Sequence, residues 1–151
     1  MQGVVYNLNT MHSRAGSQVP FSSINIGLPD SDDAALVCEI FLLEYEKGLG
    51  RGEQPIFPNI IFRVKDGVNR EEGDPYFYLY KLACRVAAKR MNPTFMNIDA
   101  DFNKEYYDRG YVPATMGCRT YLMKNVNGEP GCKGRGNIAP TTMNLPRIGL
   151  Q

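Results

Sequence analysis

Cys118 is the residue of this chain whose type and setting best suit covalent or radical chemistry. It stands between Gly117 and Arg119 on a stretch that reads as a loop. A cysteine that is partly accessible and close to a cationic side chain is typical of reactive thiols. The residues alone leave a second interpretation open, in which Cys118 is a small apolar thiol packed under a turn.

A polar segment near the start of the chain has groups that suit a phosphorylated sugar. Its side chains combine hydroxyls, a guanidinium and an amide around a glycine, and the candidates for ligand contact are Ser13, Arg14, Gly16 and Gln18. The segment is neither a Walker nor a Rossmann phosphate loop. Arg14 has the alternative role of anchoring a neighbouring carboxylate.

Asn137 is the second candidate for the catalytic site. It follows glycine in the run Gly-Arg-Gly-Asn, where flexible backbone can bring a carboxamide close to a ligand. An amide donates and accepts hydrogen bonds without titrating. The alternative is that Asn137 caps a turn.

The remaining cysteines and the single histidine predict no metal site. The four cysteines form no Cys-x-x-Cys pair, and His12 has no partner histidine. Cys38 and Cys84 fall in apolar helical patterns, so we expect both to be buried. Cys132 lies on a turn beside Lys133 and is interpreted as incidental.

Length and composition are those of one ordinary domain. The chain has 151 residues, of which 43% are hydrophobic, and a net charge of +1. This near-neutral charge argues against a polynucleotide partner. No apolar run reaches the roughly 18 to 20 residues of a membrane helix, and the start lacks the pattern of a signal peptide, so we expect a cytoplasmic protein.

The pattern of apolar residues predicts an α/β fold with parallel strands. We expect strands at residues 3–8, 18–26, 56–64 and 94–99. A helix should follow the N-cap candidates at 30–33 and end at Gly48, and a second helix should begin at Asp74-Pro75 and end before Asn92-Pro93. Strands that alternate with helices form βαβ units.

The last third of the chain reads as loops with little regular structure. Residues 103–109 predict a short helix, and residues 119–126 predict one arm of a hairpin with a later strand, turning at Asn127-Gly128. Residues 138–150 read as extended and stop without a terminating signal. The pattern is typical of a piece of a longer protein.

Several separated motifs resemble one family in order. They are the Met-Gly-Cys-Arg-Thr context of Cys118, residues 9–21, residues 48–58 and the run from Gly134 to Arg147. Together they resemble the catalytic barrel of the anaerobic (class III) ribonucleoside-triphosphate reductases. The resemblance implies a ten-stranded α/β barrel with a cysteine-bearing finger loop, of which residues 1–151 form a single partial domain. It implies that the glycyl-radical segment, its zinc site and any nucleotide-sensing domain are absent, so Gly117, Gly134 and Gly136 are not the radical glycine.

The resemblance also implies a chemistry. Cys118 matches the thiyl-radical position that removes the C3′ hydrogen of the ribose, and Asn137 matches a polar residue that hydrogen-bonds the substrate or formate. The whole enzyme would reduce ribonucleoside triphosphates to deoxyribonucleoside triphosphates, with formate as reductant and a thiol as the alternative. A separate activase with S-adenosylmethionine and an iron-sulfur cluster would install the glycyl radical, and the parent would be a homodimer.

Two other readings stay open. One is a glycyl-radical lyase of the pyruvate formate-lyase type, which shares the barrel, although the Ser-Arg-Ala-Gly and Gly-Arg-Gly-Asn contexts argue against it. The other is a non-catalytic nucleotide-binding module. On the preferred reading, this chain by itself is inactive because the radical partner lies elsewhere.

Overall fold

The computed structural model describes residues 1–12, 15–117, 120–132, 134 and 144–149. The elements of this part, in chain order, are α1 (Gln2–Thr10), β1 (Ser23–Ile26), α2 (Asp32–Lys47), β2 (Asn59–Val64), α3 (Phe77–Arg90), β3 (Thr94–Asn97), α4 (Asp101–Asp108), β4 (Thr115–Met116), β5 (Thr120–Tyr121) and α5 (Leu145–Gly149).

A three-stranded parallel sheet is the centre of the fold. Its strand order is β1-β2-β3, and the register pairs Ile24 with Ile60 and Ile61 with Thr94. Helix α2 connects β1 to β2, and α3 connects β2 to β3. The parallel strands predicted at 56–64 and 94–99, joined through a helix, are therefore confirmed, as is the α/β class.

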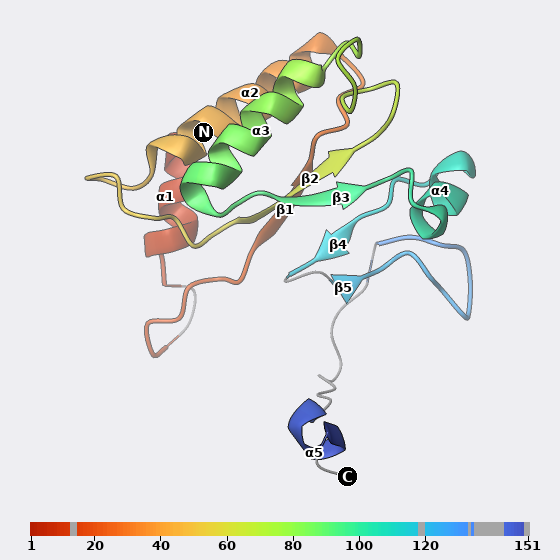
Figure 1. Cartoon of the computed structure of the whole chain (residues 1–151). Helices are drawn as coiled ribbons and strands as arrows, with labels where there is room; N and C mark the ends of the chain where they lie inside the picture. The colour runs from red at the N-terminus through yellow and green to blue at the C-terminus, as the bar shows by residue number, and fades with distance from the viewer. Residues whose placement is uncertain (13–14, 118–119, 133, 135–143, 150–151) are drawn as a thin grey trace.

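The two faces of the sheet are covered by different elements (Figure 1). Helices α2 and α3 lie side by side on one face, where Ile60 and Phe62 pack in a cluster with Leu42 and Leu79. Side chains alternate along a strand, so Ile61 points to the opposite face. We call this opposite side the hairpin face, because the β4–β5 hairpin and α4 lie over it.

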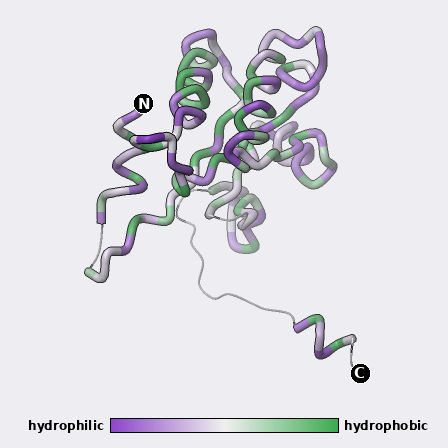
Figure 2. The backbone as a smooth tube through the Cα atoms, turned by 60° about the vertical axis from the view of Figure 1, so that its left-hand side comes forward, coloured by the Kyte–Doolittle hydropathy of each residue, from purple (hydrophilic) through white to green (hydrophobic). Residues whose placement is uncertain are grey.

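Hydrophobic and hydrophilic residues alternate along the helices in Figure 2, as expected for helices with one buried face. In α2 the ends follow the predicted signals. The Ser31 hydroxyl accepts a hydrogen bond from the Ala34 N–H at 3.3 Å, and Gly48 closes the helix with φ of 82°. A side chain at position 48 would also clash, because a Cβ there would lie 2.6 Å from the Glu53 carbonyl oxygen.

Residues 3–8 form part of helix α1, so the strand predicted there is wrong. The β-branched pair Val4-Val5 suggested a strand, but a helix places Val5 and Asn9 on one face. Val5 is then buried in the core, and the Asn9 carboxamide binds the 56–57 backbone. Its Oδ1 accepts from the Ile56 and Phe57 N–H groups at 2.8 and 3.0 Å.

The start of α3 is also corrected. The helix begins at Phe77 with Tyr76 at the N-cap position, two residues after the predicted Asp74 cap. The Asp74 carboxylate accepts instead from the Arg70 and Glu71 N–H groups, at 2.8 and 2.9 Å. It is therefore occupied by the preceding turn.

Cys84 is exposed rather than buried, whereas Cys38 is buried as predicted. The buried stripe of α3 contains Leu79, Ala83 and Val86. Because Cys84 directly follows Ala83, it is rotated about 100° away from the centre of that stripe.

The end of the chain departs from the extended prediction where the structure describes it. Residues 145–149 form α5, and the Asn144 Oδ1 accepts from the Arg147 N–H at 3.0 Å. An asparagine cap followed by Pro146 in the first turn favours a helix. Residues 138–143 and 150 lie outside the described residues.

A buried carboxamide joins the beginning of β2 to the end of α3. Asn92 is 8% exposed, and its Oδ1 accepts from the Ile60 N–H at 3.1 Å. Its Nδ2 donates to the Tyr45 Oη at 2.8 Å and to the Pro58 carbonyl at 3.2 Å, and Tyr45 donates to the Pro55 carbonyl at 3.0 Å. Burial raises the pKa of the Tyr45 phenol, which therefore stays protonated and able to donate.

We expect Asn92→Ala to lower the free energy of unfolding by about 2–4 kcal/mol. The substitution leaves the buried Ile60 N–H and the Pro58 carbonyl without their partner, and each unpaired group costs about 1–3 kcal/mol. Urea denaturation measures the change. The control is Asn127→Ala at an exposed turn, where about 0.5 kcal/mol or less is expected. Equal effects of the two substitutions would contradict the role given to Asn92.

Candidate functional site

The predicted site residues are only partly within the described structure. Cys118, Asn137, Ser13 and Arg14 lie outside the described residues, so their mutual proximity stays a prediction. Gly16 and Gln18 are described, and both are exposed. Gly16 has φ of 89°, a left-handed conformation that glycine adopts without strain, so the segment turns sharply there.

The backbone on either side of Cys118 forms a short hairpin. Strands β4 and β5 are antiparallel, with Thr115 paired to Tyr121 and Met116 paired to Thr120. Residues 120–121 thus pair with the segment before Cys118. The hairpin predicted from residues 119–126 with a later strand stays a prediction, because most of the later segment lies outside the described residues. Residues 125–129 do turn as predicted, and the Asn125 Nδ2 donates to the Glu129 carbonyl at 3.0 Å.

Side chains of the sheet hold the backbone just before Cys118. The Asn25 carboxamide bonds both backbone polar groups of Thr115. It accepts from the Thr115 N–H at 3.1 Å and donates to the Thr115 carbonyl at 2.9 Å. Gly117 is bound in the same way by two residues. Its N–H donates to the Ser23 Oγ at 3.2 Å, and its carbonyl accepts from the Asn59 Nδ2 at 2.7 Å.

The strand register explains why Ser23, Asn25 and Asn59 all lie on the hairpin face. Ser23 and Asn59 are paired neighbours in the parallel sheet, and Asn25 lies two residues beyond Ser23. Residues two apart on a strand point to the same side. No sequence motif indicated these three residues, although polar residues at alternate positions of otherwise apolar parallel strands were a usable signal.

An aromatic pair packs next to Gly117. The Phe21 and Phe57 rings meet edge to face with centroids 5.0 Å apart. A Cβ built on Gly117 would lie 3.4 Å from Phe21, and Gly117 has φ of 59°. Glycine therefore suits this position by conformation, and a Cβ there would only make an ordinary contact with Phe21.

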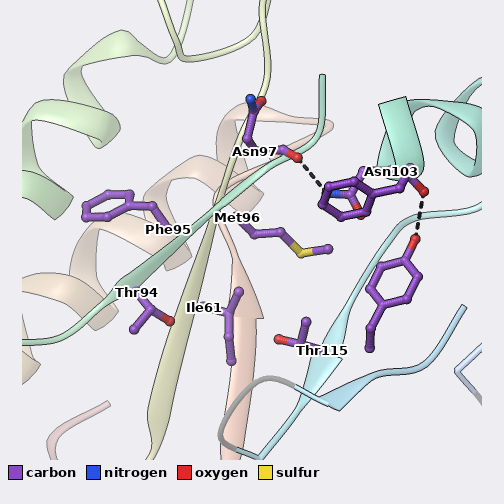
Figure 3. Close-up of a pocket in the computed structure, with 9 residues that line it drawn as sticks. Ile61, Thr94, Phe95, Met96, Asn97, Asn103 and Thr115 are labelled. Carbon is purple, nitrogen blue, oxygen red and sulfur yellow. Dashed lines mark hydrogen bonds between the residues drawn. The ribbon is translucent and has the colours of Figure 1, made fainter. Parts of the chain in front are cut away.

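A cavity of about 500 Å³ lies between the hairpin and β3 (Figure 3). Its lining is mainly apolar and comprises Ile61, Thr94, Phe95, Met96, Asn97, Phe102, Asn103, Thr115 and Tyr121. Ile61 and Met96 project from the sheet toward Thr115 in Figure 3. The Asn103 Nδ2 donates to the Asn97 carbonyl at 2.6 Å, and the Tyr121 Oη donates to the Phe102 carbonyl at 2.9 Å. The lining is thus mainly apolar, and the Asn103 amide and the Tyr121 hydroxyl both have acceptors.

Asp99 and Glu46 are engaged in surface ion pairs. Asp99 lies 3.5 Å from Lys65 and 3.3 Å from Arg70, and Glu46 lies 2.8 Å from Arg85. Burial alone would raise the pKa of Asp99, but the Asp66 N–H and the two cations outweigh it and lower that pKa.

The described residues contain no cluster of three or more His, Cys, Asp or Glu side chains placed to hold a metal ion. Across the same residues, no helix has the length and apolar character needed to cross a membrane. His12 is exposed, and the Cys132 sulfur lies 3.4 Å from the Met123 sulfur.

Comparison with known proteins identifies the family. The family model described as "Anaerobic ribonucleoside-triphosphate reductase" matches residues 1–151. The chain belongs to the anaerobic ribonucleoside-triphosphate reductase family. The resemblance seen in its motifs is thereby confirmed.

Relatives in this reductase family match nearly all of the chain. The anaerobic ribonucleoside-triphosphate reductase of Escherichia coli K12 is 36% identical over 153 residues, and that of Enterobacteria phage T4 is 37% identical over 152 residues. Both matches cover 99% of this chain but only 21% and 25% of the relatives. The chain therefore spans about a fifth to a quarter of the length of these reductases.

The cavity contains a hydroxyl whose removal should not destabilise the fold. The Thr115 Oγ1 is buried and has no hydrogen-bond partner, whereas the Thr94 Oγ1, which belongs to the same lining, donates to the Ile60 carbonyl at 3.4 Å. We expect Thr115→Val to leave the free energy of unfolding unchanged or to raise it by up to about 1 kcal/mol, because an unpaired buried hydroxyl is lost.

The matched control is Thr94→Val, which removes a bonded hydroxyl and should lower the free energy of unfolding by about 0.5–1.5 kcal/mol. Chemical denaturation of both variants measures the difference. A larger loss for Thr115→Val than for Thr94→Val would show that the Thr115 hydroxyl is bonded in the folded protein.

Proposed function

We propose that this chain is part of the catalytic barrel of an anaerobic reductase that converts ribonucleoside triphosphates to deoxyribonucleoside triphosphates. The match of the family to the full chain carries the proposal. The fold supports it, because a parallel sheet with both helices on one face leaves the other face for the hairpin that brackets Cys118. We infer that the sheet belongs to a ten-stranded barrel, that residues 1–151 are one partial domain of it, and that the hairpin is its finger loop.

In this proposal Cys118 acts as a transient thiyl radical. The sulfur takes the hydrogen atom from the ribose C3′, so that an S–H bond forms as the C–H bond breaks, and the 2′-hydroxyl can then leave as water. A glycyl radical elsewhere in the parent supplies the radical, and formate supplies the reducing equivalents. The cavity beside Thr115 has a mainly apolar lining, which suits radical chemistry.

Other residues have binding roles in the same proposal. Asn137 hydrogen-bonds the substrate or formate, since a carboxamide can donate and accept at neutral pH. Ser13, Arg14, Gly16 and Gln18 contact the sugar and phosphates of the substrate. The exposure of Gly16 and Gln18 and the sharp turn at Gly16 are compatible with that contact.

We propose that the parent is a cytoplasmic homodimer activated by a separate protein. That activase uses S-adenosylmethionine and an iron-sulfur cluster. The family match supports these roles only through the parent, so the present chain alone should be inactive. A glycyl-radical lyase is disfavoured, since the family model and the relatives are those of reductases.

In the full-length parent, we expect Cys118→Ser to abolish nucleotide reduction and to leave activase-dependent formation of the glycyl radical largely intact. Serine nearly preserves the shape of cysteine, but its O–H bond is much stronger than an S–H bond. The loss should therefore fall on the chemical step and not on substrate binding.

Under strict anaerobiosis, electron paramagnetic resonance measures the glycyl radical and a product assay measures the deoxynucleotide. The exposed Cys84 offers a matched control, and Cys84→Ser should retain both signals. Appreciable turnover by the Cys118→Ser parent would show that Cys118 does not abstract the hydrogen atom.

A further inference from the structure

The hairpin before Cys118 crosses the sheet without joining it as a strand. Its residues Thr115 and Gly117 direct their backbone N–H and carbonyl groups toward side chains of the sheet. Side chains of Asn25, Ser23 and Asn59 bond all four of these groups, at 2.7 to 3.2 Å. The sheet therefore grips this backbone through side chains.

We propose that Ser23, Asn25 and Asn59 are positioning residues that set the location of the Cys118 sulfur for hydrogen-atom abstraction. The proposal rests on the function proposed for Cys118. None of the three needs to touch the substrate. Each acts through the main chain of the hairpin.

Asn25 is suited to this role because one planar carboxamide carries a donor and an acceptor. The backbone N–H and carbonyl of Thr115 both bond to this carboxamide, as they would to a neighbouring strand. Aspartate would keep the acceptor for the Thr115 N–H but would place a carboxylate oxygen against the Thr115 carbonyl. The requirement is therefore for an amide.

The Gly117 contacts lie next to the reactive residue. Consecutive Cα atoms are about 3.8 Å apart, so fixing the N–H and carbonyl of Gly117 restricts the position of the Cys118 Cα. Phe21 lies against the same glycine, and Ser23 and Asn59 sit on adjacent, hydrogen-bonded strands. The hairpin is thus bonded at Gly117 to both β1 and β2.

The rate of hydrogen-atom abstraction depends on the distance between the reacting groups. A displacement of about 1 Å in a reacting group costs on the order of 100-fold in rate. Loss of one hydrogen bond from Ser23, Asn25 or Asn59 to the hairpin backbone should let the loop move. It removes no group that binds the substrate. The effect should appear in kcat, with KM nearly unchanged.

The test uses the full-length parent, loaded with glycyl radical by its activase. We expect Asn25→Ala and Asn59→Ala to lower kcat about 10- to 100-fold, with KM and the glycyl radical per protomer close to those of the parent. Ser23→Ala should lower kcat, and Ser23→Thr should restore most of it because the hydroxyl that accepts from the Gly117 N–H is retained. The control is Asn127→Ala at the exposed turn, outside the cavity and the hairpin, and its kcat should be unchanged.

A purely structural role predicts a different pattern. In that case the radical content and the active fraction would fall together, kcat per radical would stay constant, and Ser23→Thr and Ser23→Ala would not differ in kcat per radical. Either that pattern or unchanged kcat in the asparagine variants would overturn the proposal. If an asparagine variant folds poorly, the Ser23 pair decides the question.

Cys118→Ser in the same assays separates the two proposals. If this variant is inactive while the Asn25, Asn59 and Ser23 variants turn over normally, the positioning role of these three residues is wrong and the function of Cys118 stands. If Cys118→Ser remains active, the proposed function itself fails.

Discussion

The structure depends on one constraint, which is that buried backbone N–H and carbonyl groups must be hydrogen-bonded even where no strand or helix pairs with them. Asparagine side chains bond backbone groups at several places in or beside the sheet. Asn9 binds the 56–57 segment, Asn92 binds Pro58 and the start of β2, and Asn25 binds Thr115. Asn69, which is fully buried, does the same where β1 and β2 end, with bonds to the Gly27 carbonyl and the Lys65 N–H. A carboxamide suits each place because it supplies both a donor and an acceptor without a charge.

The same strands serve two purposes because their side chains alternate. The helix-facing residues Ile60 and Phe62 are wholly buried and stabilise the sheet through packing. The hairpin face is mixed, with Ile61 beside the polar Asn59 and the half-buried Arg63, whose Nε and Nη2 donate to the Ile26 and Asn25 carbonyls at 3.4 Å. Burial lowers the pKa of Arg63, which is the cost of placing a cation on this face. Stability and site construction are therefore separated by face within one sheet.

Family membership and the geometry support each other at the level of a partial domain. The chain corresponds to about a fifth to a quarter of the length of its reductase relatives. Its described residues bond the backbone next to the candidate thiol through side chains of the sheet. Of the predicted site residues, the structure describes only Gly16 and Gln18, whereas it reveals three framing residues that no motif had indicated.

Local sequence patterns were sufficient for the parallel βαβ core. The buried strand at 59–64, the Ser31 cap and the Gly48 stop depend on spacing within a few residues, and the structure confirms them. Tertiary contacts decided what those patterns left ambiguous. Residues 3–8 became helical because that conformation carries Val5 into the core and Asn9 to a loop 48 residues away. The hairpin around Cys118 pairs residues 115–116 with residues 120–121. Ser23 and Asn25 bind its backbone across 94 and 90 residues of sequence. A sequence pattern records neighbours along the chain, but the bonding of a buried backbone group depends on partners that only folding brings within reach.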